Sequence, residues 1–182
     1  MGDVLKFEIP LRWVRVTVKG ACFDWHKSLP KTVRERDLIS GPQVYRWLLR
    51  SNAGEIEWVY IGQSENFQKR ISAHRGGAVL QERMRDCETK GGTVELEFLD
   101  LTEPLIVNGK CITNSALREH DVRLMMESIA VVTARTEQLR VLNRLQENVD
   151  VKRLISFATQ NPEEIPRLLR ELVRMTEQTA KK

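Results

Sequence analysis

Four short runs rich in β-branched, aromatic and other apolar residues predict β-strands at 11–18, 44–49, 56–61 and 94–99. The second and third runs are separated by the sequence Ser-Asn-Ala-Gly at 51–54. These residues favour a tight turn, so we expect the two runs to form an antiparallel hairpin. The run at 94–99 alternates most regularly and predicts a further strand of the same sheet.

Helical spacing of apolar residues follows at 67–74, at 79–88 and at 116–136, with Ser64 and Ser115 as expected N-caps of the first and third helices. Further helices are predicted at 151–158 and after Pro162. This order of elements predicts an α+β fold, in which a small three-stranded antiparallel sheet is flanked by helices. We expect an N-terminal β/α extension at 1–40 packed on the core, a core domain at 41–148 and a C-terminal helical segment at 149–182.

Composition limits the function classes. The 182 residues are 41% hydrophobic and 30% charged, as in ordinary globular proteins, and no apolar run is long enough to cross a membrane. The three cysteines are odd in number and contain no CxxC pair, which argues against disulfides or a zinc site and favours a reducing cytoplasm. The net charge is +4, but residues 91–150 are acidic while both ends and the stretch 66–90 are basic. This asymmetry suits a polyanionic partner on one side.

A set of polar residues falls at positions that suggest a joint role. The chain has only two tyrosines, Tyr45 and Tyr60, and each lies in one strand of the predicted hairpin. Arg70 and His74 follow four residues apart and so share one face of the next helix. Glu127 lies beside the apolar stripe of the long helix, where a buried carboxylate is costly unless it has a partner or a function. Asn143 follows that helix.

This pattern resembles the GIY-YIG nuclease family over roughly residues 41–145. Gln43-Val44-Tyr45 matches the first half-motif and Tyr60-Ile61-Gly62 the second, although Gln43 stands where the family has glycine. Arg70 and His74 match the first helix of the family, Glu127 its metal-binding helix and Asn143 the closing position.

The resemblance implies a Mg²⁺-dependent endonuclease that hydrolyses phosphodiester bonds of DNA, with Mn²⁺ as a substitute. It implies that Glu127 is the protein ligand of the metal, which suits a cation that keeps several waters and uses few carboxylates. Arg70 would stabilise charge on the phosphate, and Tyr45 would orient and deprotonate the attacking water. His74 would assist Tyr45, Tyr60 would lie near the phosphate, and Asn143 would hold the end of the site together.

We expect DNA to be the partner, with no membrane association. The basic residues that are candidates for DNA contacts are Lys69, Arg75, Arg167, Arg170 and Arg174. Zinc-finger spacing, a helix-turn-helix signature and a second catalytic domain are absent from the sequence, which favours a restriction or mobile-element type of enzyme. If both strands are cut, one active site per chain predicts a homodimer or two sequential nicks.

Two alternatives remain at this level. The chain could be a catalytically inactive or structure-specific nucleic-acid-binding module of the same fold. It could also be an unrelated α+β interaction domain, because a tyrosine in a strand, an Arg–His pair on a helix and an asparagine after a helix each have ordinary structural roles. Metal-dependent cleavage of DNA would distinguish the endonuclease from both of these alternatives.

Overall fold

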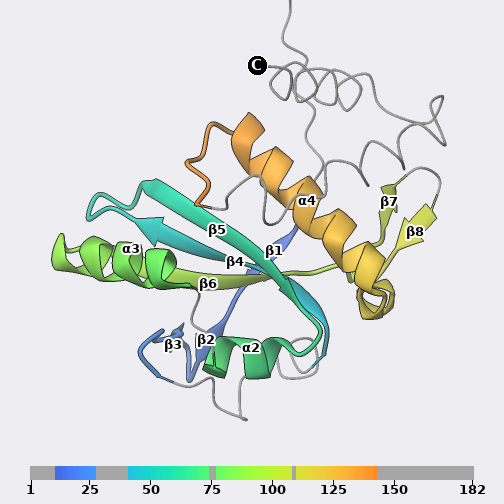
Figure 1. Ribbon diagram of the computed structural model, residues 1–182, viewed down its shortest axis with the longest axis horizontal. Coiled ribbons are helices and arrows are strands. Elements are labelled where there is room, and N and C mark those ends of the chain that lie inside the picture. The colour runs from blue at the N-terminus through green and yellow to red at the C-terminus, as the bar shows by residue number, and fades with distance from the viewer. Residues whose placement is uncertain (1–10, 28–40, 74–76, 108–109, 143–182) are drawn as a thin grey trace, which may run out of the picture.

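The computed structural model describes residues 11–27, 41–73, 77–107 and 110–142 (Figure 1). Its centre is a four-stranded antiparallel sheet in the order β1 (Trp13–Arg15), β6 (Thr93–Leu99), β4 (Gln43–Arg50) and β5 (Ile56–Ser64). The α+β class is confirmed, but the predicted three-stranded sheet is wrong. The N-terminal strand pairs with β6, with Val14 opposite Phe98, because β6 otherwise leaves its outer edge without a hydrogen-bonding partner.

Short elements complete the described part. Two small antiparallel ladders join β2 (Thr17–Val18) to β3 (Ala21–Cys22) and β7 (Leu105–Val107) to β8 (Lys110–Ile112). The helices are α2 (Phe67–Ala73), α3 (Ala78–Thr89) and α4 (His120–Thr136), and a 3₁₀ turn at Asn114–Arg118 precedes α4.

The predicted elements are largely present, with shifted ends. The hairpin turn forms as expected: the Ser51 and Glu55 backbones pair at 2.8 Å, and Gly54 adopts a positive φ of 84°. The long helix begins at His120 rather than 116, so Ser115 lies in the 3₁₀ turn and is not its N-cap. At α2, the cap is Asn66 rather than Ser64, because the Asn66 side chain accepts a hydrogen bond from the Lys69 backbone at 2.9 Å.

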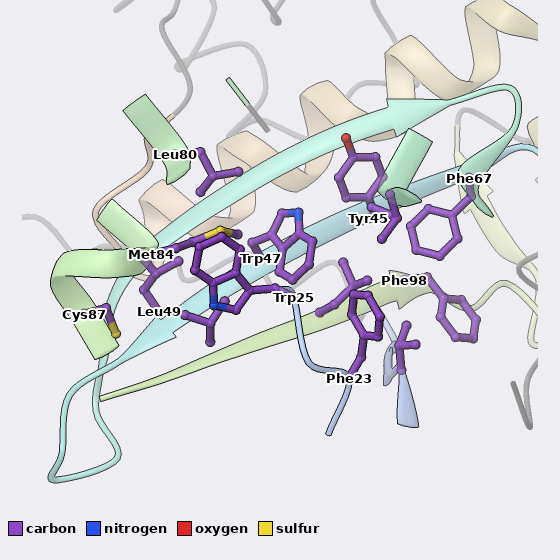
Figure 2. Packing of buried hydrophobic residues seen from close by; sticks show 14 residues of the cluster. Phe23, Trp25, Tyr45, Trp47, Leu49, Phe67, Leu80, Met84, Cys87 and Phe98 are labelled. Atoms are coloured by element: carbon purple, nitrogen blue, oxygen red, sulfur yellow. The ribbon is translucent and has the colours of Figure 1, made fainter. Parts of the chain in front are cut away.

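Different helices cover the two faces of the sheet (Figure 1). On one face, α2 and α3 cover an aromatic-rich cluster, drawn in Figure 2, that contains Tyr45, Trp47, Phe67 and Phe98. On the other face, α4 covers an aliphatic cluster that includes Leu48, Val59, Ile61 and Ile129. Residues alternate between these faces along each strand, so neighbouring positions of β4 and β5 supply both cores. Within the described ranges, no helix is long and apolar enough to span a bilayer.

Gly92 joins α3 to β6 at a point where no side chain fits. A Cβ added there would lie 2.2 Å from the backbone oxygen of Arg50 and 2.7 Å from Sγ of Cys87. The obstructing oxygen belongs to backbone within the sheet, so the strand itself would have to move.

We predict that Gly92→Ala lowers the free energy of unfolding by about 1–3 kcal/mol, the usual cost of inserting a methyl group into a filled space. Urea denaturation followed by tryptophan fluorescence measures this change. Gly77→Ala is the matched control, because a Cβ at Gly77 meets no atom within 4 Å. Equal stability of the two variants would contradict the packing described for Gly92.

Candidate active site

The register of β4 against β5 brings the two tyrosines together. Tyr45 lies opposite Gly62, and Trp47 lies opposite Tyr60, so the two phenols are diagonal neighbours on the same face of the sheet. This is the face that α2 and α3 cover. The structure therefore places the tyrosines of both half-motifs in one site.

Gly62 makes room for the Tyr45 ring. A Cβ at Gly62 would lie 2.8 Å from the Tyr45 hydroxyl oxygen, 2.9 Å from Cζ of the same ring and 3.2 Å from Cε1 of Tyr60. The glycine of the second half-motif is thus required by the tyrosine of the first, because the phenol crosses the strand where any larger residue would displace it.

Arg70 reaches the same site from α2. Its Nε donates a hydrogen bond to the Tyr45 hydroxyl oxygen at 3.5 Å, and Phe67, one turn earlier, packs against the Tyr45 ring with centroids 5.4 Å apart. The pKa of Arg70 is raised, first by its hydrogen bond with Tyr45 and also by Tyr60. Figure 2 shows the Tyr45 hydroxyl pointing away from the apolar cluster that holds its ring.

Tyr45 is a neutral phenol over the physiological pH range. Burial of the ring raises its pKa to about 12, and repulsion from Tyr60 and Glu127 acts in the same direction, while Arg70 acts against them. As long as the phenol keeps its proton, it can donate that proton to an oxygen atom placed beside it.

Glu127 lies on α4 with only 4% of its surface exposed. Within the described ranges, no group donates a hydrogen bond to its carboxylate and no cation lies within ion-pair distance. Burial therefore raises its pKa to about 7, although the charge of Arg70 acts in the opposite direction. Arg70 and Tyr45 both interact electrostatically with Glu127, although α4 lies on the opposite face of the sheet from α2.

A buried arginine that the sequence pattern did not reveal holds α4 against β5. Arg123, one turn before Glu127, is 4% exposed and donates from Nη1 to the backbone oxygens of Leu117 and Arg118 at 2.8 and 2.9 Å. Its Nε donates to Gln63 at 3.0 Å, next to Gly62 in β5. Arg123 is therefore a positioning residue for the helix that carries Glu127. In the sequence, the only indication of this role is that Arg123 lies four residues before Glu127, and so on the same side of the helix.

The Glu127 carboxylate suits a hard cation that takes few ligands from the protein. In the residues that can be described, histidine, cysteine, aspartate and glutamate form no group of three or more. A single buried carboxylate without a hydrogen-bond donor is the kind of ligand that Mg²⁺ uses together with water and substrate phosphate. Glu127 fits that description, and its desolvation would be offset by a bound cation.

The structure brings together four of the predicted site residues, Tyr45, Tyr60, Arg70 and Glu127. Lys69 is exposed on α2 beside Arg70. The other predicted residues lie outside the described ranges: His74, Arg75, Asn143, Arg167, Arg170 and Arg174. Their proposed roles remain predictions.

Comparison with known proteins gave no relative: no protein-family model, no curated protein and no solved structure matches the chain.

We predict that Gly62→Ala displaces the Tyr45 ring, because the added methyl group would overlap it. With only two tyrosines in the chain, ¹³C labelling at tyrosine Cζ gives two NMR signals that report the site directly. Both signals should shift in Gly62→Ala and stay in place in Gly41→Ala, where a Cβ meets nothing within 4 Å. Unchanged signals in Gly62→Ala would contradict the crossing of the ring over the glycine.

Glu127 should make stability depend on pH. Because the pKa of Glu127 is raised from 4.5 to about 7 in the folded protein, its contribution to stability is fully present below pH 4.5, where the carboxyl group is protonated. That contribution is lost as the pH rises through 7. In metal-free buffer at pH 8, we predict that Glu127→Gln is more stable than wild type by about 3 kcal/mol.

This advantage should disappear near pH 4.5, where both side chains are neutral. Urea denaturation at each pH measures the difference, with Glu82→Gln as the control because Glu82 is exposed on α3. A difference that does not vary with pH would show that the Glu127 carboxylate is not desolvated.

Proposed function

We propose that the chain is a metal-dependent phosphodiesterase that cleaves DNA. The observation that carries the proposal is the buried Glu127 carboxylate, which lacks a hydrogen-bond donor among the described residues and shares a site with Arg70 and two phenols. A structural role leaves this arrangement unexplained, because an unpartnered buried carboxylate destabilises the fold at neutral pH. A site that binds a cation and a phosphate accounts for all four groups.

The groups have complementary tasks in hydrolysis. Mg²⁺, held by Glu127, would supply positive charge to the phosphate and the departing oxygen. Arg70 presents a planar fork of donors, which binds phosphate oxygens and stabilises the negative charge that grows on them. Tyr60 interacts with the Arg70 side chain and can donate a hydrogen bond to the phosphate that Arg70 binds.

Tyr45 would orient the attacking water. The new bond joins the water oxygen to phosphorus, and the bond from phosphorus to the sugar oxygen of the departing strand breaks. For Tyr45 to accept the water's proton, its own pKa must fall from about 12. Burial is the largest cause of the raised value, and repulsion from Tyr60 and Glu127 adds to it. A cation bound at Glu127 would remove the last of these causes and add a positive charge that lowers the pKa of Tyr45.

DNA is the substrate class we favour, and the restriction or mobile-element assignment rests on sequence features alone. The geometry bears on the chemistry of the bond and not on the recognised sequence.

We predict that purified protein converts supercoiled plasmid to open-circular or linear forms with Mg²⁺ and not with EDTA. Glu127→Gln and Tyr45→Phe should each lower the rate about 100-fold or more, the usual cost of removing one group that stabilises a transition state. Glu82→Gln should retain activity, since Glu82 lies on the exposed face of α3.

The alternatives give different results. DNA binding without cleavage under any divalent cation would favour the inactive binding module. Neither binding nor cleavage would favour an interaction domain and would sink the proposal. Cleavage that persists in folded Glu127→Gln would identify a contaminating nuclease or a different metal site.

A further inference from the structure

A second group of basic and aromatic side chains continues the face that carries Tyr60. Trp58 lies two residues before Tyr60 in β5 and on the same side of the sheet. The guanidinium groups of Arg83 and Arg140 lie over the Trp58 ring, 5.1 and 5.5 Å from its centroid. Arg83 comes from α3, and Arg140 comes from the segment that follows α4. Three separate elements thus meet at one point.

Arg140 is fixed in place by backbone pairing with the outer edge of β5. The Val59 backbone N–H donates to the Arg140 carbonyl at 2.9 Å, and the Leu142 N–H donates to the Val59 carbonyl at 2.8 Å. Val141 forms a parallel bridge with Val59. This pairing puts Arg140 and Leu142 on the same face as Trp58 and Tyr60, along the edge of β5.

Among the described residues, Arg83 and Arg140 form no ion pair with a carboxylate. On the opposite face of the sheet, Arg15 and Arg50 both pair with Glu95, at 3.0 and 2.9 Å, and Arg46 pairs with Glu97 at 2.7 Å. By contrast, Arg83 and Arg140 are exposed and have no carboxylate within 4 Å in the described part of the chain. Asp86, close to Arg83 on α3, forms its ion pair with Lys90 at 2.8 Å and interacts with Arg83 only through the weaker electrostatic attraction at longer range.

The Trp58 ring orients the two arginines and is not itself a free stacking surface. Cation–π contact holds a guanidinium in a defined place while its N–H donors stay available. Two like charges held at one ring repel each other, and a bound anion would offset that repulsion. The arrangement is therefore suited to binding a phosphate with forked hydrogen bonds.

We propose that Trp58, Arg83 and Arg140 form a binding subsite for a backbone phosphate of duplex DNA, next to the phosphate that is cut. This inference rests on the proposed function for the position of the cut. Trp58 and Tyr60 are separated by about 6.6 Å along the strand, which places the subsite within about two nucleotides of the scissile phosphate. Arg70 binds the phosphate that reacts, and Arg83 and Arg140 bind its neighbour.

The test compares two double variants in the full-length protein. Arg83→Gln with Arg140→Gln removes the subsite. Arg85→Gln with Arg118→Gln removes the same charge from exposed positions that lack the tryptophan contact. Arg85 lies two residues from Arg83 and so projects from the other side of α3. Thermal unfolding confirms that each variant is folded, and Arg83→Lys with Arg140→Lys tests whether charge without the fork is enough.

The first measurement is fluorescence anisotropy with a labelled duplex in EDTA, over a range of salt concentrations. The subsite variant should bind at least 10-fold more weakly, and the slope of log K against log salt should fall by about 0.9 for each lost phosphate contact. The control variant should change less in both respects. Equal losses in the two variants would overturn the subsite and leave only general electrostatic attraction.

The second measurement separates the subsite from the catalytic proposal. With Mg²⁺, the subsite variant should cleave bis(p-nitrophenyl) phosphate like wild type, because this small diester has no neighbouring phosphate, but should show a raised KM for DNA. If wild type cleaves neither substrate while the subsite variant still loses DNA affinity, the catalytic proposal fails and the subsite stands. If wild type cleaves DNA and the subsite variant matches the control, the subsite fails and the catalytic proposal stands.

Discussion

The register between β4 and β5 is the constraint on which the site depends. Tyr45 can cross the neighbouring strand only because Gly62 is its partner, and Tyr60 shares its face only because it lies two residues from that glycine. A slip of one residue would turn every side chain of β5 to the other face and bury Trp58 and Tyr60 against α4. The register is held by the hairpin turn at 51–55 and by the alternation of two different cores, aromatic on one side and aliphatic on the other.

Charged side chains across β1, β4 and β6 differ in their partners from those around β5. On β1, β4 and β6, arginines and glutamates pair with each other across strands, so their burial is compensated locally and calls for no ligand. Around β5, the cations Arg70, Arg83 and Arg140 meet phenols and an indole instead of carboxylates, and the carboxylate of Glu127 is buried without a hydrogen-bond donor in the described part. Such an arrangement costs stability unless an external anion and cation complete it. The contrast within one sheet makes chance placement a poor explanation.

Local signals in the sequence were sufficient for the hairpin, β6, α3 and the body of α4, but not for the short strands β7 and β8. The turn residues at 51–54 and the alternation at 94–99 predict the hairpin and β6, and helical spacing predicts α3 within a residue or two. The tyrosines, Arg70 and Glu127 could be named because each lies in a recognisable element. The partner of β1 could not be predicted, because Val14 and Phe98 are far apart in the chain and strand pairing at that distance leaves no local pattern. The same limit hid Arg140, whose place is fixed by hydrogen bonds to Val59.

Arg123 shows why the missed residues matter for the chemistry. An arginine on an amphipathic helix looks like a solvent-exposed position in the sequence, yet Arg123 is buried and donates hydrogen bonds inward, to two backbone carbonyls and to Gln63. Its charge is dispersed over neutral acceptors and is not neutralised by Glu127, although the two lie one turn apart on α4. An ion pair between them would have lowered the pKa of Glu127 and removed the observation on which the proposed metal site rests. By binding Gln63 and the preceding turn instead, Arg123 anchors α4 beside Gly62 and leaves the carboxylate available to a cation.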